Sequence, residues 1–175
     1  MSKTEEHLKA AFAGESQARN KYTYYAQVAQ KEGYHYIAKI LEETAENERR
    51  HAKDEFALLG GIGETAANLQ KAIDGEQYET ITMYPEFAKD AEAEGNMKAA
   101  VLFRMIARVE AHHRARFQKL LDRVKNGTVY KRDKAIQWKC SVCGYVHEGT
   151  EPPPKCPCCQ HPKEYYEPAN LETNI

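Results

Sequence analysis

The chain has 175 residues, of which 42% are hydrophobic and 29% are charged, and its formal net charge is -1. This balance, with no basic stripe, excludes the electrostatic footprint of a nucleic-acid-binding protein. No apolar run approaches the roughly 20 residues of a membrane span, and the first residues lack the apolar core of a signal peptide. We therefore expect a cytoplasmic protein without a membrane partner, large enough for one bundle-sized core.

Two helices are predicted before Gly60-Gly61. The first follows a capping box at Ser2–Glu5 and carries apolar residues at helical spacing as far as Glu32. Gly33 is suited to a left-handed turn that would end it. The second helix is predicted from about Tyr34 to Leu59. These two helices form the first predicted hairpin, which turns near Gly33.

A long connection is predicted between the second helix and the third. The stretch from Ile62 to Gly75 is too long for a tight turn, so we expect a crossover connection that contains a short helix over residues 66–73. The third helix is predicted to begin near Glu76 and to end before Gly95. Pro85 lacks a backbone N–H and therefore predicts a kink near Met83-Tyr84.

A fourth helix is predicted from Asn96, which is a good N-cap, to about Lys125, with Asn126-Gly127 as its stop. Four long helices in two similar hairpins, joined by one crossover, predict an all-α ferritin-like four-helix bundle. We expect this bundle to occupy residues 1–133, because helical periodicity ends after Asp133. Residues 134–175 form a second predicted domain.

Metal-binding chemistry is indicated by two of the three copies of the pattern Glu-x-x-His, Glu48–His51 and Glu110–His113, whereas the third, Glu32–His35, is expected to be a chance copy. A Glu and a His at this spacing on a helix direct a carboxylate and an imidazole toward the same point. Each copy has a lone Glu about one hairpin upstream: Glu15 precedes Glu48, and Glu79 precedes Glu110 at almost the same separation. The repeated arrangement predicts a metal site rather than a chance occurrence of the pattern.

Helix geometry supports this pairing. Glu15 and Glu48 lie at similar sequence distances on the two sides of a turn at Gly33, and Glu79 and Glu110 do so around Gly95. At about 1.5 Å per residue, the members of each pair reach nearly the same height. Such ligands meet inside di-iron and di-manganese bundles. The alternative is a solvated helix face. The predicted site has six members: Glu15, Glu48, His51, Glu79, Glu110 and His113.

The C-terminal tail carries all five cysteines of the chain. Cys140-x-x-Cys143 and Cys156-x-x-Cys159 form two pairs with the spacing of a tetrahedral sulfur site for zinc or a single iron. A domain of about 40 residues usually needs such a metal to stay folded. Cys158 is the spare thiol and is expected to point away. The cysteine pattern alone favours a structural zinc ribbon.

Several segments resemble the rubrerythrin family. They are Gly14–Asn20, Glu48–Lys53, Met83–Pro85, and Trp138–Gly149 followed by Cys156-Pro-Cys-Cys159, so the similarity covers nearly the whole chain. The resemblance implies two iron ions in a carboxylate-bridged site in the bundle. It also implies a small rubredoxin-like β/loop domain that holds one iron on four Cys thiolates. One departure is Gln160, where stand-alone rubredoxins usually have Gly.

The resemblance also implies a function. In rubrerythrins the tail iron passes electrons to the di-iron centre, and this combination favours a peroxidase that reduces hydrogen peroxide to water, protects against oxidative stress and receives electrons from a reductase or rubredoxin. A head-to-tail homodimer is implied, in which the tail of one subunit lies near the di-iron site of its partner. The di-iron ligands implied are Glu15, Glu48, Glu79, Glu110 and His113, with Glu48 and Glu110 bridging and His51 binding in the reduced state.

A second departure concerns Thr82. In the family one iron moves between the His that corresponds to His51 and an additional Glu, three positions after the third-helix ligand. Counted from Glu79, that position is Thr82, and Thr is a poor substitute for a carboxylate. Thr82 therefore predicts that His51 stays bound or that a water fills the oxidised site, so that the metal shift is reduced or lost.

Two other functions fit the same residues. A ferroxidase or iron-storage protein would use the bundle but has little need of a tetrathiolate electron carrier. Peroxide turnover that requires a reduced tail would distinguish a peroxidase from a ferroxidase. The second possibility is an electron-transfer module, or a zinc-stapled structural protein with a vestigial bundle. Zinc in the tail would favour the structural protein.

Overall fold

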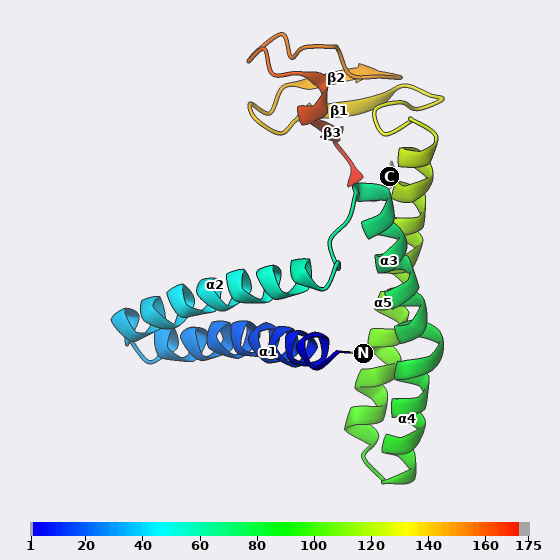
Figure 1. Cartoon of the computed structure of the whole chain (residues 1–175). Helices are drawn as coiled ribbons and strands as arrows, with labels where there is room; N and C mark the ends of the chain where they lie inside the picture. The colour runs from blue at the N-terminus through cyan, green and yellow to red at the C-terminus, as the bar shows by residue number, and fades with distance from the viewer. Residues whose placement is uncertain (1, 172–175) are drawn as a thin grey trace. The chain divides into compact units, whose positions relative to one another are not determined.

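The computed structural model describes residues 2–171 (Figure 1). Its helical elements are α1 (Lys3–Lys31), α2 (His35–Leu58), α3 (Thr65–Tyr78), the π-helical turn η1 (Glu79–Met83), α4 (Tyr84–Ala93) and α5 (Met97–Lys125). The tail contains β1 (Ile136–Cys140), β2 (Val146–Gly149), the 3-10 turn η2 (Lys163–Tyr165) and β3 (Tyr166–Pro168). The chain divides into two compact units, residues 1–63 and 64–175. The mainly helical fold class is confirmed.

The first unit is the hairpin of α1 and α2 (Figure 1). Ser2 caps α1 as predicted, because its side chain accepts a hydrogen bond from the backbone N–H of Glu5 at 3.2 Å. Gly33 adopts φ +84°, a left-handed conformation that glycine reaches without strain, and the chain turns there. Small side chains let the two helices approach closely, and the buried alanines with their partly buried neighbour are Ala26, Ala29, Ala38 and Leu41.

The second unit contains a helix that begins earlier than predicted. The expected short helix over 66–73 is the first part of α3, which continues through Gly75 instead of ending there. Glycine inside a helix costs about 1 kcal/mol relative to alanine. Burial of Ile73, which is 4% exposed, and packing of α3 against α5 offset that cost. The connection from α2 to α3 is therefore residues 59–64, shorter than the predicted stretch of 62–75.

The kink predicted near Met83-Tyr84 takes the form of the π-helical turn η1, where the Tyr84 N–H bonds to the Glu79 carbonyl. Pro85 has no N–H to donate and its ring would clash with the carbonyl of the preceding helical turn. A π turn accommodates this by placing one extra residue in the helix. Side chains that follow η1 therefore point in different directions from those of a continuous α-helix, and this change occurs close to Glu76 and Glu79.

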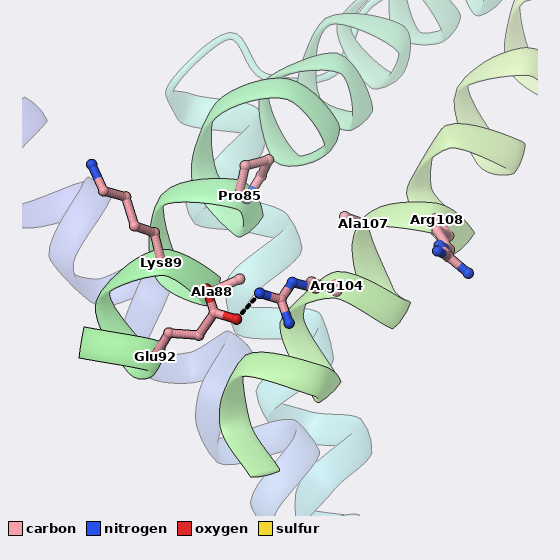
Figure 2. A pocket seen from close by; sticks show the side chains of 7 residues that line it. All are labelled: Pro85, Ala88, Lys89, Glu92, Arg104, Ala107 and Arg108. Carbon is pink, nitrogen blue, oxygen red and sulfur yellow. Dashed lines mark hydrogen bonds and ion pairs between the residues drawn. The ribbon is translucent and has the colours of Figure 1, made fainter. Parts of the chain in front are cut away.

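Helix α5 packs along this run. Asn96 caps α5 as predicted, because its side chain accepts from the Ala99 N–H at 3.2 Å. A groove of about 360 Å³ lies between α4 and α5, and an ion pair between Glu92 and Arg104 crosses it (Figure 2). None of the predicted metal ligands lines this groove. It is therefore separate from the candidate metal centres.

The tail forms a three-stranded antiparallel sheet with strand order β2-β1-β3. Its core contains Trp138, Cys140, Cys156 and Tyr166. The Trp138 indole N–H donates to the Gly149 carbonyl at 3.0 Å, and the Arg132 guanidinium lies 5.1 Å from the Trp138 ring centroid. The sheet belongs to the same compact unit as α3, α4 and α5. The predicted domain boundary at residue 133 stays a prediction.

Candidate metal centres

The four predicted cysteines of the tail converge. Their sulfurs all lie within 4.8 Å of one another. The Cys140 and Cys159 sulfurs are 3.7 Å apart, and those of Cys143 and Cys156 are 3.6 Å apart. A tetrahedron with metal–sulfur bonds of about 2.3 Å has edges of about 3.8 Å. The spacing therefore fits one tetrahedrally bound metal ion. Cys158 is outside the cluster and exposed, as predicted.

Two similar knuckles hold these cysteines. The Gly144 N–H donates to the Cys140 carbonyl, and the Gln160 N–H donates to the Cys156 carbonyl, each at 2.9 Å. Both donors adopt a left-handed backbone, with φ +78° at Gly144 and +64° at Gln160. Gln160 is the only non-glycine residue with positive φ in the described part of the chain. The departure noticed in the sequence is therefore a backbone strain in the second knuckle.

Replacing Gln160 with Gly should stabilise the tail. A left-handed non-glycine residue costs roughly 1–2 kcal/mol, and the extra freedom of an unfolded glycine returns about 0.5–1 kcal/mol. We expect the free energy of tail unfolding to rise by about 0.5–1 kcal/mol. The single Trp, Trp138, is buried in the tail and reports its unfolding by fluorescence. Gly144→Gln is the matched reverse change and should destabilise. An unchanged free energy of tail unfolding in Gln160→Gly would contradict the proposed backbone strain.

The ionisation of the tail cysteines favours binding of a cation. Burial opposes ionisation of Cys156, yet the Tyr166 hydroxyl, the backbone N–H groups of Cys159 and Cys158, and the Cys143 thiol lower the pKa of Cys156 to about 6. The pKa of Cys143 is raised: a backbone hydrogen bond from Tyr145 lowers it, but burial and the neighbouring thiols outweigh that bond. A thiolate is the metal-binding form, so the site begins with one ionised ligand near neutral pH.

The first carboxylate cluster lies on α1 and α2. Ligand atoms of Glu15, Glu48 and His51 lie within 4.8 Å of one another. His51 Nδ1 is 2.8 Å from Glu48 Oε2, as the Glu-x-x-His spacing predicts. The pKa of Glu15 is raised, first by its hydrogen bond to Glu48, then by burial and the Glu48 charge, although His51 lowers it. Two carboxyl groups therefore lie close enough at this position for Glu48 to disfavour ionisation of Glu15.

The second carboxylate cluster lies on α3 and α5. Ligand atoms of Glu76, Glu110 and His113 lie within 4.8 Å of one another. His113 Nδ1 is 2.6 Å from Glu110 Oε2 and 3.8 Å from Glu76 Oε1. The other oxygen of Glu76, Oε2, is buried and has no hydrogen-bond partner in the described chain. An orphaned carboxylate oxygen beside a carboxylate and an imidazole fits a metal ion.

The structure therefore brings five of the six predicted bundle residues into clusters and places Glu76, rather than Glu79, in the second. Glu79 lies one turn later, in η1, and is half-buried. Its charge still reaches the cluster, because it raises the pKa of Glu76. Tyr84, also absent from the predicted site, is close enough that burial and then the charges of Glu79, Glu110 and Glu76 raise its pKa.

This change of register also corrects the interpretation of Thr82. The residue three positions after Glu76 is Glu79, so the position expected to carry an additional carboxylate does carry one. The departure predicted at Thr82 came from counting from Glu79. His112, which lies two residues after Glu110, is exposed. The expectation that His51 stays bound depended on Thr82 and stays a prediction.

Charge repulsion in the second cluster predicts a pH effect on the metal-free protein. Burial first, then Glu110, raises the pKa of Glu76. A raised carboxyl pKa gives stability that is present below the unfolded value, about 4.3, and is lost as pH rises through the folded value. Glu76→Gln should therefore raise the metal-free melting temperature at pH 7, by about 2–4 °C for 1 kcal/mol.

The same Gln variant should have no advantage at pH 4, where the wild-type carboxyl is already neutral. Thermal scans of metal-free wild type and variant at both pH values measure this difference. Glu42→Gln, at an exposed position on α2, is the control and should show no pH-dependent gain. An equal shift at both pH values would contradict the proposed repulsion.

Helices that bear clusters of two carboxylates and a histidine, together with a four-cysteine site, define a class of iron-binding oxidoreductases. The sequence profile of the rubrerythrin family matches residues 6–121, and the profile described as the rubredoxin-like domain of rubrerythrin matches residues 138–167. The chain belongs to the rubrerythrin family. Family membership and the ligand clusters confirm the predicted cofactors, which are two iron ions at the carboxylates and one on four thiolates.

Similar proteins carry the same family name. The chain is 48% identical to the rubrerythrin of Porphyromonas gingivalis, over 99% of this chain and 92% of that protein. It is 46% identical to a putative rubrerythrin of Methanocaldococcus jannaschii, over 95% and 93%, and 44% identical to the rubrerythrin of Nitratidesulfovibrio vulgaris, over 95% and 94%. Among the described residues no helix is both long and apolar enough to cross a membrane.

Proposed function

We propose that this protein is a non-haem di-iron peroxidase that reduces hydrogen peroxide to water with electrons delivered through its tail iron. The observation that carries the proposal is the coexistence, in one chain, of two matching carboxylate and histidine clusters and a four-sulfur site. The carboxylate clusters suit two metal ions that together give two electrons to peroxide, and the sulfur site suits one-electron transfer. Family membership supports an iron-based function in oxidative stress.

The two clusters are proposed to supply the ligands for two iron ions. Each offers two carboxylates and one imidazole, and a di-iron bundle uses four carboxylates and two histidines. Glu48 and Glu110, each hydrogen-bonded to its own histidine, would be ligands of the two ions. Glu15 and Glu76 would complete the carboxylate set, with His51 as a ligand of the reduced state and Glu79 as an additional carboxylate.

The chemistry needs two electrons and two protons for each peroxide, which yields two water molecules. Bound ferrous iron supplies one electron from each ion for cleavage of the O–O bond. The protein's part is to hold the ligands and the protons. Glu76 Oε2 is buried and unpartnered among the described residues, and the pKa of Glu76 is raised by burial. The raised pKa favours the protonated form of this carboxyl in the metal-free protein.

The tail is proposed to return the two electrons one at a time from a reductase or a rubredoxin. Family resemblance supports a head-to-tail homodimer, in which each tail serves its partner's bundle. Sedimentation of the iron-loaded protein tests the dimer, and a monomer with full peroxide turnover would contradict it. We also place the protein in the cytoplasm, where reducing conditions keep the tail cysteines as thiols.

Steady-state turnover tests the peroxidase proposal. The iron-loaded protein is mixed with hydrogen peroxide and an excess of reduced rubredoxin, and the consumption of both is followed. We expect two electrons consumed for each peroxide. The ferroxidase alternative uses the same clusters and predicts oxidation of added ferrous iron by dioxygen, independent of the tail. Accumulation of ferric product without peroxide-dependent rubredoxin oxidation would favour that alternative.

A further inference from the structure

Tyr166 belongs to the core of the cysteine site but is not one of its ligands. It is the first residue of β3, and its register partner on β1 is Cys140. The side chain is 4% exposed and packs in one buried cluster with Trp138, Cys140 and Cys156. The strand pairing therefore holds a phenol ring beside two of the four metal-binding sulfurs.

The hydroxyl of Tyr166 lacks an ordinary acceptor. It is buried and makes no hydrogen bond to an oxygen or nitrogen atom among residues 2–171. A buried hydroxyl that leaves water without an acceptor is destabilising, and most such groups in native proteins have a partner. After burial, the groups that raise the pKa of Tyr166 are Cys156 first and then Cys140. Cys156 and Cys140 also belong to the buried cluster that contains Tyr166, so their sulfur atoms are among the polar neighbours of this hydroxyl.

We propose that, in the iron-loaded protein, the Tyr166 O–H donates a hydrogen bond to Cys156 Sγ and raises the reduction potential of the tail iron. Four thiolates around ferric iron carry a net charge of about -1, and one added electron makes it -2. A donor to a ligand sulfur stabilises the more negative, reduced form. The orphaned hydroxyl and the sulfur then satisfy each other.

Tyr166 is therefore a positioning residue that tunes the electron carrier. A higher potential eases reduction of the tail by an external donor and lowers the driving force for transfer to the bundle. The inference rests on the electron-carrying role proposed for the tail. Its test reads the tail iron alone, so loss of peroxidase activity in the bundle would leave the inference intact.

The test is an equilibrium redox titration of the visible thiolate-to-iron bands in the full-length, iron-loaded protein. Tyr166→Phe keeps the ring and removes the hydroxyl. We expect its reduction equilibrium constant to fall by about tenfold, which is about 59 mV for a one-electron couple. Tyr165→Phe is the matched control, because Tyr165 precedes it and is 46% exposed. The control should titrate like wild type.

A second variant keeps the test decisive if Tyr166→Phe fails to bind iron. Replacement of Tyr166 by 3,5-difluorotyrosine keeps the shape and makes the hydroxyl a stronger donor, so the potential should rise. Resonance Raman spectra should show a change in the iron–sulfur stretching bands, which a purely packing role would not produce. Reduction equilibrium constants within twofold of the wild-type value in both variants would overturn the inference.

Discussion

Replacement of Glu76 with Ala should remove iron from the bundle, whereas replacement of Glu79 with Ala should leave two ions bound there. Glu76 lies with Glu110 and His113 in one cluster, and its buried Oε2 has no other partner among the described residues. Loss of a supporting hydrogen-bond partner alone costs about 10–100-fold in metal affinity, so loss of a direct ligand should cost at least about 100-fold. Iron analysis after reconstitution, with the tail iron counted by its visible bands, measures the difference.

The Glu79 variant is the matched control for charge, because both changes remove one carboxylate from the same helical run. It should retain iron but alter the reduced state, in which His51 is proposed to bind. Thr82→Ala should change neither. Iron lost in Glu79→Ala and retained in Glu76→Ala would restore the ligand assignment expected from the sequence.

Replacement of Cys156 with Ser should empty the tail and disconnect the bundle from its electron donor. Cys156 is fully buried, and a domain of this size depends on its metal for folding. We expect steady-state peroxide turnover with reduced rubredoxin to fall at least about 100-fold, the range seen when a unit of a catalytic system is removed. A single turnover by chemically reduced bundle iron should persist.

Cys158→Ser is the control for this change, because Cys158 is exposed and outside the four-sulfur cluster. It should retain tail iron and full turnover. Rubredoxin-driven turnover that survives in Cys156→Ser would mean that electrons reach the bundle without the tail, which contradicts the proposed path.

Much of this arrangement follows from local sequence rules. The helix starts at Ser2 and Asn96 were predictable because a side-chain cap is a local interaction. The left-handed turn at Gly33 was predictable because glycine reaches positive φ without strain. The four cysteine ligands were predictable because their spacing fixes two knuckles regardless of the surrounding fold.

The third helix was less accessible from sequence. Gly75 suggested an end to a short helix, but tertiary packing of α3 against α5 outweighs the cost of a helical glycine. The first hairpin gave a usable signal, because Glu76 is only one position farther from the Gly95 turn than Glu15 is from the Gly33 turn. That single extra position matches the extra residue of the π turn η1, which Pro85 favours but does not position uniquely.

Tyr166 shows a different limit. No periodicity marks it in a segment dominated by Pro and Cys, and its burial depends on the register of β3 against β1. Strand register in a short, irregular sheet is set by long-range contacts. Its role beside the cysteine site therefore needed the structure.

The most direct test of the peroxidase proposal is a stopped-flow experiment in which the fully reduced, iron-loaded protein is mixed with hydrogen peroxide. The appearance of the ferric tetrathiolate bands reports oxidation of the tail. We predict rapid tail oxidation in the wild type and its loss in Glu48→Ala, because the peroxide reacts at the carboxylate iron and draws electrons from the tail. Tail oxidation at the same rate in both proteins would mean that the bundle is not the reactive site, and would contradict the proposed function.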